Sequence, residues 1–291
     1  MIDLYLLEEL VAFLEKGTLA ETAKVLNVTQ PTITRGMQKL EEELGVQLFN
    51  REPNKITLTK VGEFAAKKAK EAITVNQDYA KEVKNFDISQ NTITLASNAP
   101  GPLIILNTLK TKNIKADSSL LLESNYNYQS LLLNEQYTCL ILNFPLEDKN
   151  ISSIYLGKEN LFVHINEFTQ LASKKEVSFN DLSNLTFLVI SDIGIWKQII
   201  QNEIPNAKFL YQNDSTNFTE IRNNSIFPYF TTNITKLSSH QQKKELKDRV
   251  QLAIKNTSAQ QSFYACFLKK NKNRLRPLIE KIQDKWEEID Q

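Results

Sequence analysis

Residues 27–35 read NVTQPTITR and place three threonines, a glutamine, a proline and an arginine at the expected start of a helix. The first four amides of a helix have no partner within it, and the hydroxyl of Thr29 can accept a hydrogen bond from one of them. Pro31 lacks an amide hydrogen where none is needed, and its fixed φ suits a first turn. The stretch therefore predicts a helix that begins with Thr29 as its cap.

This helix presents polar side chains at its start. Its apolar stripe has spacings of four, three and four residues, and the members of the stripe are Ile33, Met37, Leu40 and Leu44. At about 100° per residue, Arg35 lies opposite the stripe, Thr32 and Thr34 flank it, and Gln30 can point beyond the helix end. Glutamine, arginine and threonine are the side chains that read base edges and phosphates in a DNA major groove.

The preceding residues predict a shorter helix and a tight turn. Thr18 and Glu21 form a capping box, and Asn27 and Val28 form the turn into the next helix. A short helix, a turn and a longer helix make the helix-turn-helix arrangement. The alternative is a solvated polar face on an ordinary helical bundle, and the spacing alone leaves both interpretations open.

Regular elements are expected on both sides of these two helices. Residues 3–15 predict an amphipathic helix with an apolar face, namely Leu4, Leu7, Val11 and Leu14. VQLF and ITLT flank a Pro-Asn turn and predict a small hairpin. Residues 60–86 predict a long helix, and the polar residues 85–91 predict a linker.

This part of the chain resembles the N-terminal domain of LysR-type transcriptional regulators. The matching positions have fixed spacing and no gap: Gly17, Ala23, Leu26, Val28, Gln30, Pro31, Ile33, Arg35, Leu40, Glu41, Leu44, Gly45, Leu48, Phe49, Arg51, Leu58, Thr59 and Gly62. The resemblance implies a winged helix-turn-helix that contacts DNA bases through Thr29, Gln30, Thr32, Thr34 and Arg35. It also implies that Arg51 and Lys55 in the wing touch phosphates. The chain departs from the family pattern at Thr22, Gln47 and Gly36.

The long helix allows a heptad register with small residues first and large residues later. Positions a are Ala69, Asn76 and Val83, and positions d are Ala65, Ala72, Tyr79 and Phe86. The alternative is a helix that packs only on its own domain. The resemblance favours a homodimer through this helix, or a tetramer built from dimers, with the two helix tips about 34–36 Å apart on double-stranded DNA.

Composition fits a multidomain protein whose global charge does not explain its partners. The chain has 291 residues, is 41% hydrophobic and carries 35 basic against 34 acidic residues. Contact with nucleic acid therefore requires a local patch. No apolar run approaches the roughly 18 residues of a membrane span, and the acidic first helix does not fit a signal peptide. We expect a cytoplasmic location and no membrane partner.

From residue 92 the sequence alternates between strands and helices, which predicts an α/β domain with a largely parallel sheet. The expected strands are residues 92–97, 118–124, 137–144, 151–157, 160–165 and 186–191. The region resembles the effector domain of the same family, which has two α/β subdomains as in a periplasmic binding protein.

The expected fold is thus an α+β multidomain chain. Residues 1–59 form the winged helix-turn-helix, 60–91 the linker and dimerisation helix with a hinge, and 92–291 the effector-binding domain. Within the latter, subdomain one takes about 92–160 plus 264–291, and subdomain two about 161–263.

A small-molecule effector is expected in the cleft between the subdomains. Ligands in open α/β folds gather at the carboxyl ends of strands, where free helix amides favour anionic groups. The candidate contacts are Ser97, Asn98, Asn143, Ser191, Asp192, Thr231 and Thr232. Each of them can instead serve only as a turn or helix-capping residue.

Other chemistry finds little support in the sequence. Cys139 and Cys266 lie in apolar runs, and His164 and His240 are far apart. No metal-ligand spacing, P-loop or dinucleotide fingerprint occurs, so no catalytic residue, metal or cofactor is expected. The sequence therefore predicts a DNA-binding regulator that responds to a small molecule. The alternatives are an effector-independent regulator, a ligand-binding module without a role on DNA, and an α/β enzyme.

Overall fold

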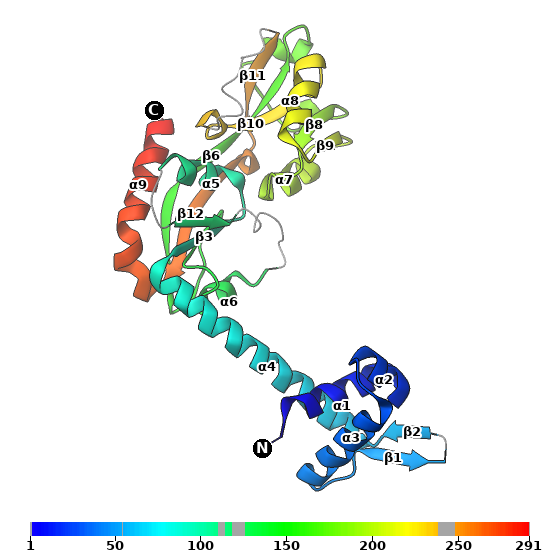
Figure 1. Cartoon of the computed structure of the whole chain (residues 1–291). Coiled ribbons are helices and arrows are strands. Elements are labelled where there is room, and N and C mark those ends of the chain that lie inside the picture. The colour runs from blue at the N-terminus through cyan, green and yellow to red at the C-terminus, as the bar shows by residue number, and fades with distance from the viewer. Residues whose placement is uncertain (1, 54, 110–113, 118–125, 238–247, 291) are drawn as a thin grey trace. The chain divides into compact units, whose positions relative to one another are not determined.

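The computed structural model describes residues 2–53, 55–109, 114–117, 126–237 and 248–290 (Figure 1). The chain divides into two compact units, Met1–Lys84 and Asn85–Gln291. The expected strand at residues 118–124 and the candidate His240 lie outside the described residues. None of the helices among the described residues is both long enough and apolar enough to cross a lipid bilayer.

The first unit contains three short helices, a hairpin and the start of a long helix. Its elements are α1 (Leu4–Lys16), α2 (Leu19–Val25), α3 (Gln30–Leu44), β1 (Phe49–Glu52), β2 (Lys55–Leu58) and α4 (Lys60–Asn91). β1 and β2 pair antiparallel, with Phe49 opposite Leu58. The expected helices and hairpin are therefore confirmed.

The core of this unit joins one face of α1 to the stripe of α3. Leu6, Leu10 and Phe13 of α1 are buried, and they pack with Ile33, Met37 and Leu40 of α3. The stripe expected for α1 is confirmed only in part: Leu7 and Val11 are half-buried and pack against this core, Leu4 is half-buried, and Leu14 is 39% exposed. Leu44, expected inside, is also 39% exposed, because the last turn of α3 extends beyond the core.

Gly36 in the middle of α3 has a packing reason. Glu9 of α1 is only 5% exposed, and a Cβ on Gly36 would overlap its carboxyl group. Burial raises the pKa of Glu9 to about 7, and its Oε2 has no hydrogen-bond partner. The departure from the family pattern at this position therefore makes room for a buried acid between α1 and α3.

The long helix α4 is continuous from Lys60 to Asn91. The polar residues 85–91, expected as a linker, are helical. Thr59 starts the helix by accepting a hydrogen bond from the Gly62 amide at 2.9 Å. Gly62 is required there because a Cβ would overlap the carbonyl oxygen of Leu48, which precedes the hairpin. The hairpin and the long helix are thus held together by close backbone contact.

The second unit is an α/β fold. Its strands are β3 (Ile93–Ser97), β4 (Ile114–Asp117), β5 (Cys139–Leu142), β6 (Ile151–Asn166), β7 (Glu176–Val177), β8 (Thr186–Ile190), β9 (Lys208–Gln212), β10 (Tyr229–Thr232), β11 (Arg249–Ile254) and β12 (Gln260–Leu268). Its helices are α5 (Pro100–Thr108), α6 (Tyr128–Leu133), α7 (Ile195–Glu203), α8 (Ser215–Asn224) and α9 (Lys272–Asp290). The strand order is β4-β3-β5-β12-β6-β10-β8-β9, with β11 and β7 off this path.

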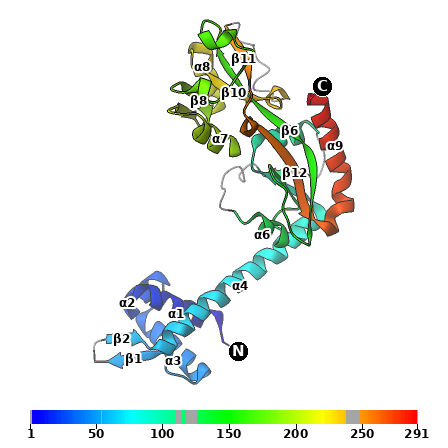
Figure 2. The same cartoon turned by 180° about the vertical axis from the view of Figure 1, so that it is seen from behind.

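Two long strands, β6 and β12, cross the middle of this unit side by side (Figure 2). Residues 151–157 and 160–165 were expected as separate strands, but β6 is continuous through Gly157 and Asn160. Its first part pairs with β12, and its last part, from Leu161 onward, pairs with β10 and β11. β6 therefore belongs to both halves of the unit.

Each half has its own hydrophobic core. One core joins Leu95, Ile141, Phe263 and the inner face of α9, and the other joins Val163, Phe187 and Leu252 with parts of α7. The parallel pairs β3–β4, β3–β5 and β8–β9 bear out the expected α/β pattern, whereas β6 and β12 pair antiparallel. An α/β domain of two halves joined by crossover strands is confirmed.

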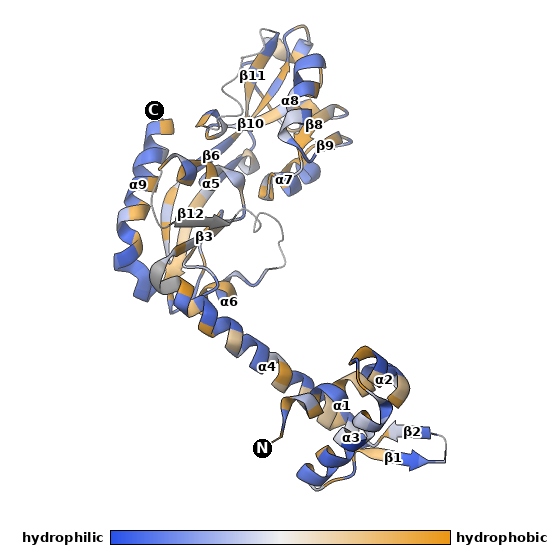
Figure 3. Cartoon of the chain, in the orientation of Figure 1, coloured by the Kyte–Doolittle hydropathy of each residue, from blue (hydrophilic) through white to orange (hydrophobic). Residues whose placement is uncertain are grey.

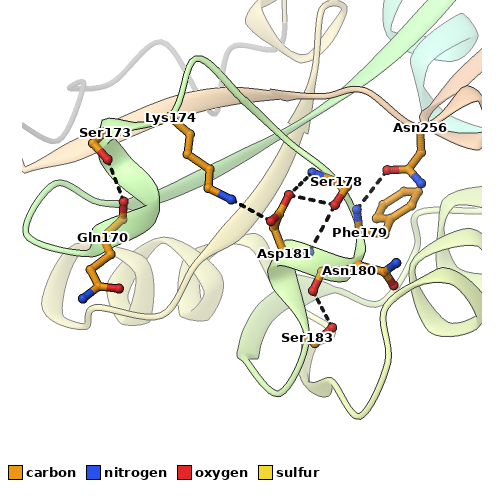
Figure 4. A network of polar contacts seen from close by, with 9 residues as sticks. All are labelled: Gln170, Ser173, Lys174, Ser178, Phe179, Asn180, Asp181, Ser183 and Asn256. Carbon is orange, nitrogen blue, oxygen red and sulfur yellow. Dashed lines mark hydrogen bonds and ion pairs between the residues drawn. The ribbon is translucent and has the colours of Figure 1, made fainter.

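A polar network fixes the loop that carries β7 (Figure 4). Asp181 accepts hydrogen bonds at 2.7 Å from both the amide and the hydroxyl of Ser178, and it pairs with Lys174 at 2.6 Å. The ammonium of Lys174 and the donors of Ser178 hold the pKa of Asp181 well below its usual range. Asn256 accepts a hydrogen bond from the Phe179 amide at 2.9 Å and so ties this loop to the residues after β11.

Candidate functional site

The turn between α2 and α3 sets the angle of the second helix. Asn27 has a φ of 54°, in the left-handed region that asparagine tolerates better than most residues. The amide of Val28 donates to the carbonyl of Ala23 at 3.0 Å and closes the turn. The sequence signal for this turn was therefore read correctly, and it leads the chain directly into the cap at Thr29.

The start of α3 is capped and exposed. The hydroxyl of Thr29 accepts from the Thr32 amide at 3.4 Å and lies 2.8 Å from the Thr32 hydroxyl. Thr34 is half-buried and donates to the carbonyl of Gln30 at 3.1 Å. Gln30 and Arg35 are exposed, and the structure shows neither side chain hydrogen-bonded or ion-paired within the described residues. The amide and the guanidinium are thus available to an outside partner.

Glu41 holds the hairpin against α3. Its Oε1 accepts from the amides of Leu48 and Phe49 at 2.8 and 3.0 Å, and its Oε2 pairs with Arg51 at 2.8 Å. Arg51, a predicted phosphate contact, is therefore already engaged by a carboxylate within its own domain, although it stays exposed. Lys55 is exposed on β2. The role of Glu41 was missed, because a sequence match does not reveal which amides a carboxylate caps.

The predicted dimerisation positions fall into two groups along α4. Ala69 is buried in the core of the first unit and Ala65 packs at its edge, so their side chains face their own domain. The later positions, from Ala72 and Asn76 to Tyr79, Val83 and Phe86, are exposed.

At about 100° per residue, several large apolar side chains share one face of this helix. Exposed members within about 60° of Tyr79 are Val61, Phe64, Val75, Tyr79 and Val83. Hydrophobic bands recur along α4 (Figure 3). We call these five residues the linker face. Exposed apolar faces of this kind are typical of interaction surfaces.

The predicted effector contacts lie around two separate hollows in the second unit. Asn98 and Asn143 line a groove of about 660 Å³ beside α7. The side-chain amide of Asn98 donates a hydrogen bond to the side-chain oxygen of Asn143 at 2.7 Å. Asp192 and Thr231 line a second, apolar cavity, to which Thr232 also belongs.

The two halves of the unit touch directly between these hollows. The amide of Ile195 donates to the carbonyl of Asn98 at 3.0 Å, and a Cβ on Gly194 would overlap that carbonyl. Ser97 is buried and accepts from the Ala99 amide at 3.2 Å, so it caps the turn before α5. Ser191 donates to Asn213 at 2.5 Å. Neither serine is among the residues that line the two hollows.

The apolar cavity has a volume of about 220 Å³. Its wall comes from α5, the middle of β6, the ends of β8 and β10, and the helices α7 and α8. The apolar part of the lining includes Ile104, Leu161, Leu188, Val189, Ile193, Trp196, Ile200, Phe218 and Phe230. It is therefore the better candidate for an apolar ligand.

One buried acid belongs to this wall and was not predicted. Glu159 lies in β6 and is only 1% exposed. The indole N–H of Trp196 and the hydroxyl of Thr232, on the same wall, are its hydrogen-bonding neighbours. Burial raises the pKa of Glu159 to about 7, and Thr232 and Trp196 act in the opposite direction. Local sequence could not reveal this, because Glu159 lies between the two expected strands, where a glutamate usually faces solvent.

Residues expected to be structural behave as such. His164 lies in β6, 2.9 Å from the Thr231 hydroxyl, and stacks on Tyr229. Burial, together with Arg222 and Arg249, lowers its pKa to about 4. Cys139 and Cys266 are buried free thiols, and burial raises the pKa of both.

The first unit as a whole is a winged helix-turn-helix domain, defined by α2, the turn, α3 and the β1–β2 hairpin. Residues 4–63 match the family profile described as "Bacterial regulatory helix-turn-helix protein, lysR family". A protein of Azotobacter vinelandii named "Uncharacterized HTH-type transcriptional regulator in ibpB-leuC intergenic region" is 30% identical over 99 residues, 33% of this chain and 68% of that protein. This chain therefore belongs to the LysR family.

Other relatives match over smaller shares of their own length. "Uncharacterized HTH-type transcriptional regulator YbhD" of Escherichia coli (strain K12) is 42% identical over 71 residues, 24% of this chain and 22% of that protein. "HTH-type transcriptional regulator BsdA" of Bacillus subtilis (strain 168) is 25% identical over 193 residues, 66% of this chain and 59% of that protein. Both matches span less than two thirds of the relative. The solved structure "Crystal Structure of full-length BenM" has 18% identity, covers 97% of this chain and 96% of that chain, and has a TM-score of 0.46.

Proposed function

We propose that this chain is a sequence-specific DNA-binding transcriptional regulator that acts as a homodimer. The observation that carries the proposal is the start of α3, where Gln30 and Arg35 are exposed and have no partner within the described residues. A helix that only filled a core would not present a free amide and a free guanidinium there. Both groups suit base edges in a major groove.

The linker face supports the homodimer. A two-fold axis would bring Tyr79 and Val83 of each protomer against the same residues of its partner and cover apolar surface that is now exposed. Two winged domains would then lie on one duplex with their tips about one helical turn apart, roughly 34–36 Å. Association of two such dimers into a tetramer is compatible with this arrangement.

The second unit is the proposed sensor. A small molecule in the cavity beside Glu159 would contact both halves, because Ile104 belongs to one core cluster and Trp196 to the other. Such a ligand can change the angle between the halves, and hence DNA binding, only to the extent that it binds one arrangement more tightly than the other.

Replacing Arg35 with alanine should weaken operator binding by about 5-fold to 150-fold, the equivalent of about 1–3 kcal/mol for a lost base contact. Retardation of genomic fragments adjacent to the gene measures this loss. Arg276→Ala is the matched control, since Arg276 is an exposed arginine in the second unit and should leave the affinity unchanged. The proposal is refuted if no fragment is retarded at low salt, or if Arg35→Ala binds as tightly as the unmodified protein.

A further inference from the structure

We propose that the cavity beside Glu159 binds a small hydrophobic amine, whose protonated amino group pairs with the Glu159 carboxylate while its ring or alkyl chain fills the apolar part. This inference rests on the proposed sensor function for the biological role of the ligand. The binding event itself needs no DNA and can be measured separately.

The size and lining of the cavity set the body of the ligand. An apolar cavity of about 150 Å³ lined by Leu, Ile and Phe accepts benzene. The present cavity, at about 220 Å³, has room for one aromatic ring and a short chain. Leu161, Leu188 and Phe218 lie on its wall and would bury that ring.

The polar wall sets the head group. An ionised carboxylate that is buried without a partner is costly, and a cation placed against it removes much of that cost. Glu159 provides a buried carboxyl group whose hydrogen-bonding neighbours, Thr232 and Trp196, are neutral, so its charge is not balanced by a cation. A Cβ on Gly101 would overlap this carboxyl group, so the first turn of α5 lies against it.

Charge on the rest of the wall points the same way. Asp192 lines the cavity as a second carboxylate and is exposed. Among the described residues of the lining there is no lysine, arginine or histidine. An anionic ligand would therefore meet two carboxylates and no cation. The sequence had instead suggested an anion at this helix start, a place that the structure gives to Glu159.

Two further groups suit an ammonium ion. The Thr232 hydroxyl lies beside Glu159 on this wall, and its oxygen can accept a hydrogen bond from the ammonium. Trp196, Phe218 and Phe230 supply aromatic faces, which attract cations when the site excludes water.

Isothermal titration of the full chain at pH 8 tests the head group with three probes of the same body: 2-phenylethylamine, 2-phenylethanol and 3-phenylpropionate. We expect the amine to bind at least about 10-fold more tightly than the alcohol. We expect no detectable binding of the carboxylate. Tighter binding of the carboxylate or the alcohol, or binding of none of the three, overturns the inference.

The pH dependence follows from the same carboxyl group. Because burial raises the pKa of Glu159 to about 7, this group is largely protonated at pH 6 in the empty cavity and must lose its proton to pair with an ammonium. Amine affinity should therefore rise from pH 6 to pH 8 and then level off, while alcohol affinity stays constant. An amine affinity that is flat or falling over this interval contradicts the assignment.

Glu159→Gln should remove the preference, so that amine and alcohol bind equally. Glu147→Gln removes one carboxylate from an exposed surface position and should leave both affinities unchanged. If Glu159→Gln fails to fold, the titrations of the three probes on the unmodified protein still test the inference. Retardation of DNA fragments distinguishes the two proposals. Amine binding without DNA binding contradicts only the proposed regulator function, and DNA binding without amine binding contradicts only the amine site.

Discussion

Replacing Trp286 with alanine will lower the free energy of unfolding of the C-terminal unit by about 3–5 kcal/mol, the range for deleting a large buried aromatic side chain. Trp286 is 1% exposed and stacks on Phe263 with ring centroids 5.8 Å apart. Its indole N–H donates to the carbonyl of Lys158 at 2.8 Å. A Cβ on Gly157 would overlap the indole, so β6 passes directly beneath the ring.

The lost stability has two causes: the cavity left by the indole, and the Lys158 carbonyl on β6, which no longer accepts its hydrogen bond. Because a domain is stable by only about 5–15 kcal/mol, a change of this size is a large fraction of the total. Urea unfolding followed by tryptophan fluorescence measures it, because both tryptophans lie in the C-terminal unit and Trp196 remains in the variant. Glu287→Ala, an exposed position in the same helix, should change stability by less than about 0.5 kcal/mol. A loss below about 1 kcal/mol for Trp286→Ala would show that α9 does not hold β6 as described.

A charged pair on the linker face will convert the proposed dimer into monomers. In Tyr79→Glu/Val83→Glu, four glutamates would meet across a two-fold axis where apolar side chains, now 68% and 53% exposed, are expected to be buried. Burial of one large apolar side chain contributes about 1.5–3 kcal/mol. The dimer dissociation constant should therefore rise by about 100-fold or more.

Sedimentation at several concentrations distinguishes the two states. Lys81→Glu introduces the same change of two negative charges on the opposite side of α4 and should remain dimeric. In the double variant, loss of the dimer should also lower operator affinity, because two separate monomers must then bind the two half-sites independently. Lys81→Glu should leave operator affinity unchanged. A monomeric unmodified protein, or a double variant that stays dimeric, would contradict the role of this face.

The sequence was sufficient to predict an element where interactions between residues close in the chain determine it. The cap at Thr29, the turn at Asn27 and the stripe Ile33–Met37–Leu40 predicted α3 and its exposed start, because capping and periodicity act within a few residues. The face of α1 could not be predicted in this way. That helix is apolar on several sides, and only its packing against α3 decides that Leu6 and Leu10 face the core.

Long-range packing also explains what was missed in the second unit. Gly157 and the polar residues after it suggested an end to the strand, but Gly157 is present to accommodate Trp286, which lies more than a hundred residues further along the chain. Glu159 falls between the two strands expected from the sequence, as an ordinary polar residue, and only the convergence of α5, α7 and β10 turns it into a buried acid. The position of Ser97 at the end of a strand predicts a ligand contact, whereas in the structure its hydroxyl accepts a hydrogen bond from the Ala99 amide in the turn that follows.

The central claim is that the start of α3 enters a DNA major groove. Dimethyl sulfate methylates guanine N7 in the major groove and adenine N3 in the minor groove, so it reports which groove the protein occupies. On an operator found by retardation, we predict two clusters of protected guanine N7 about 10 base pairs apart. In Arg35→Ala, guanine protection should be lost within each cluster. Unprotected guanines, or protection confined to adenine N3, would contradict the account.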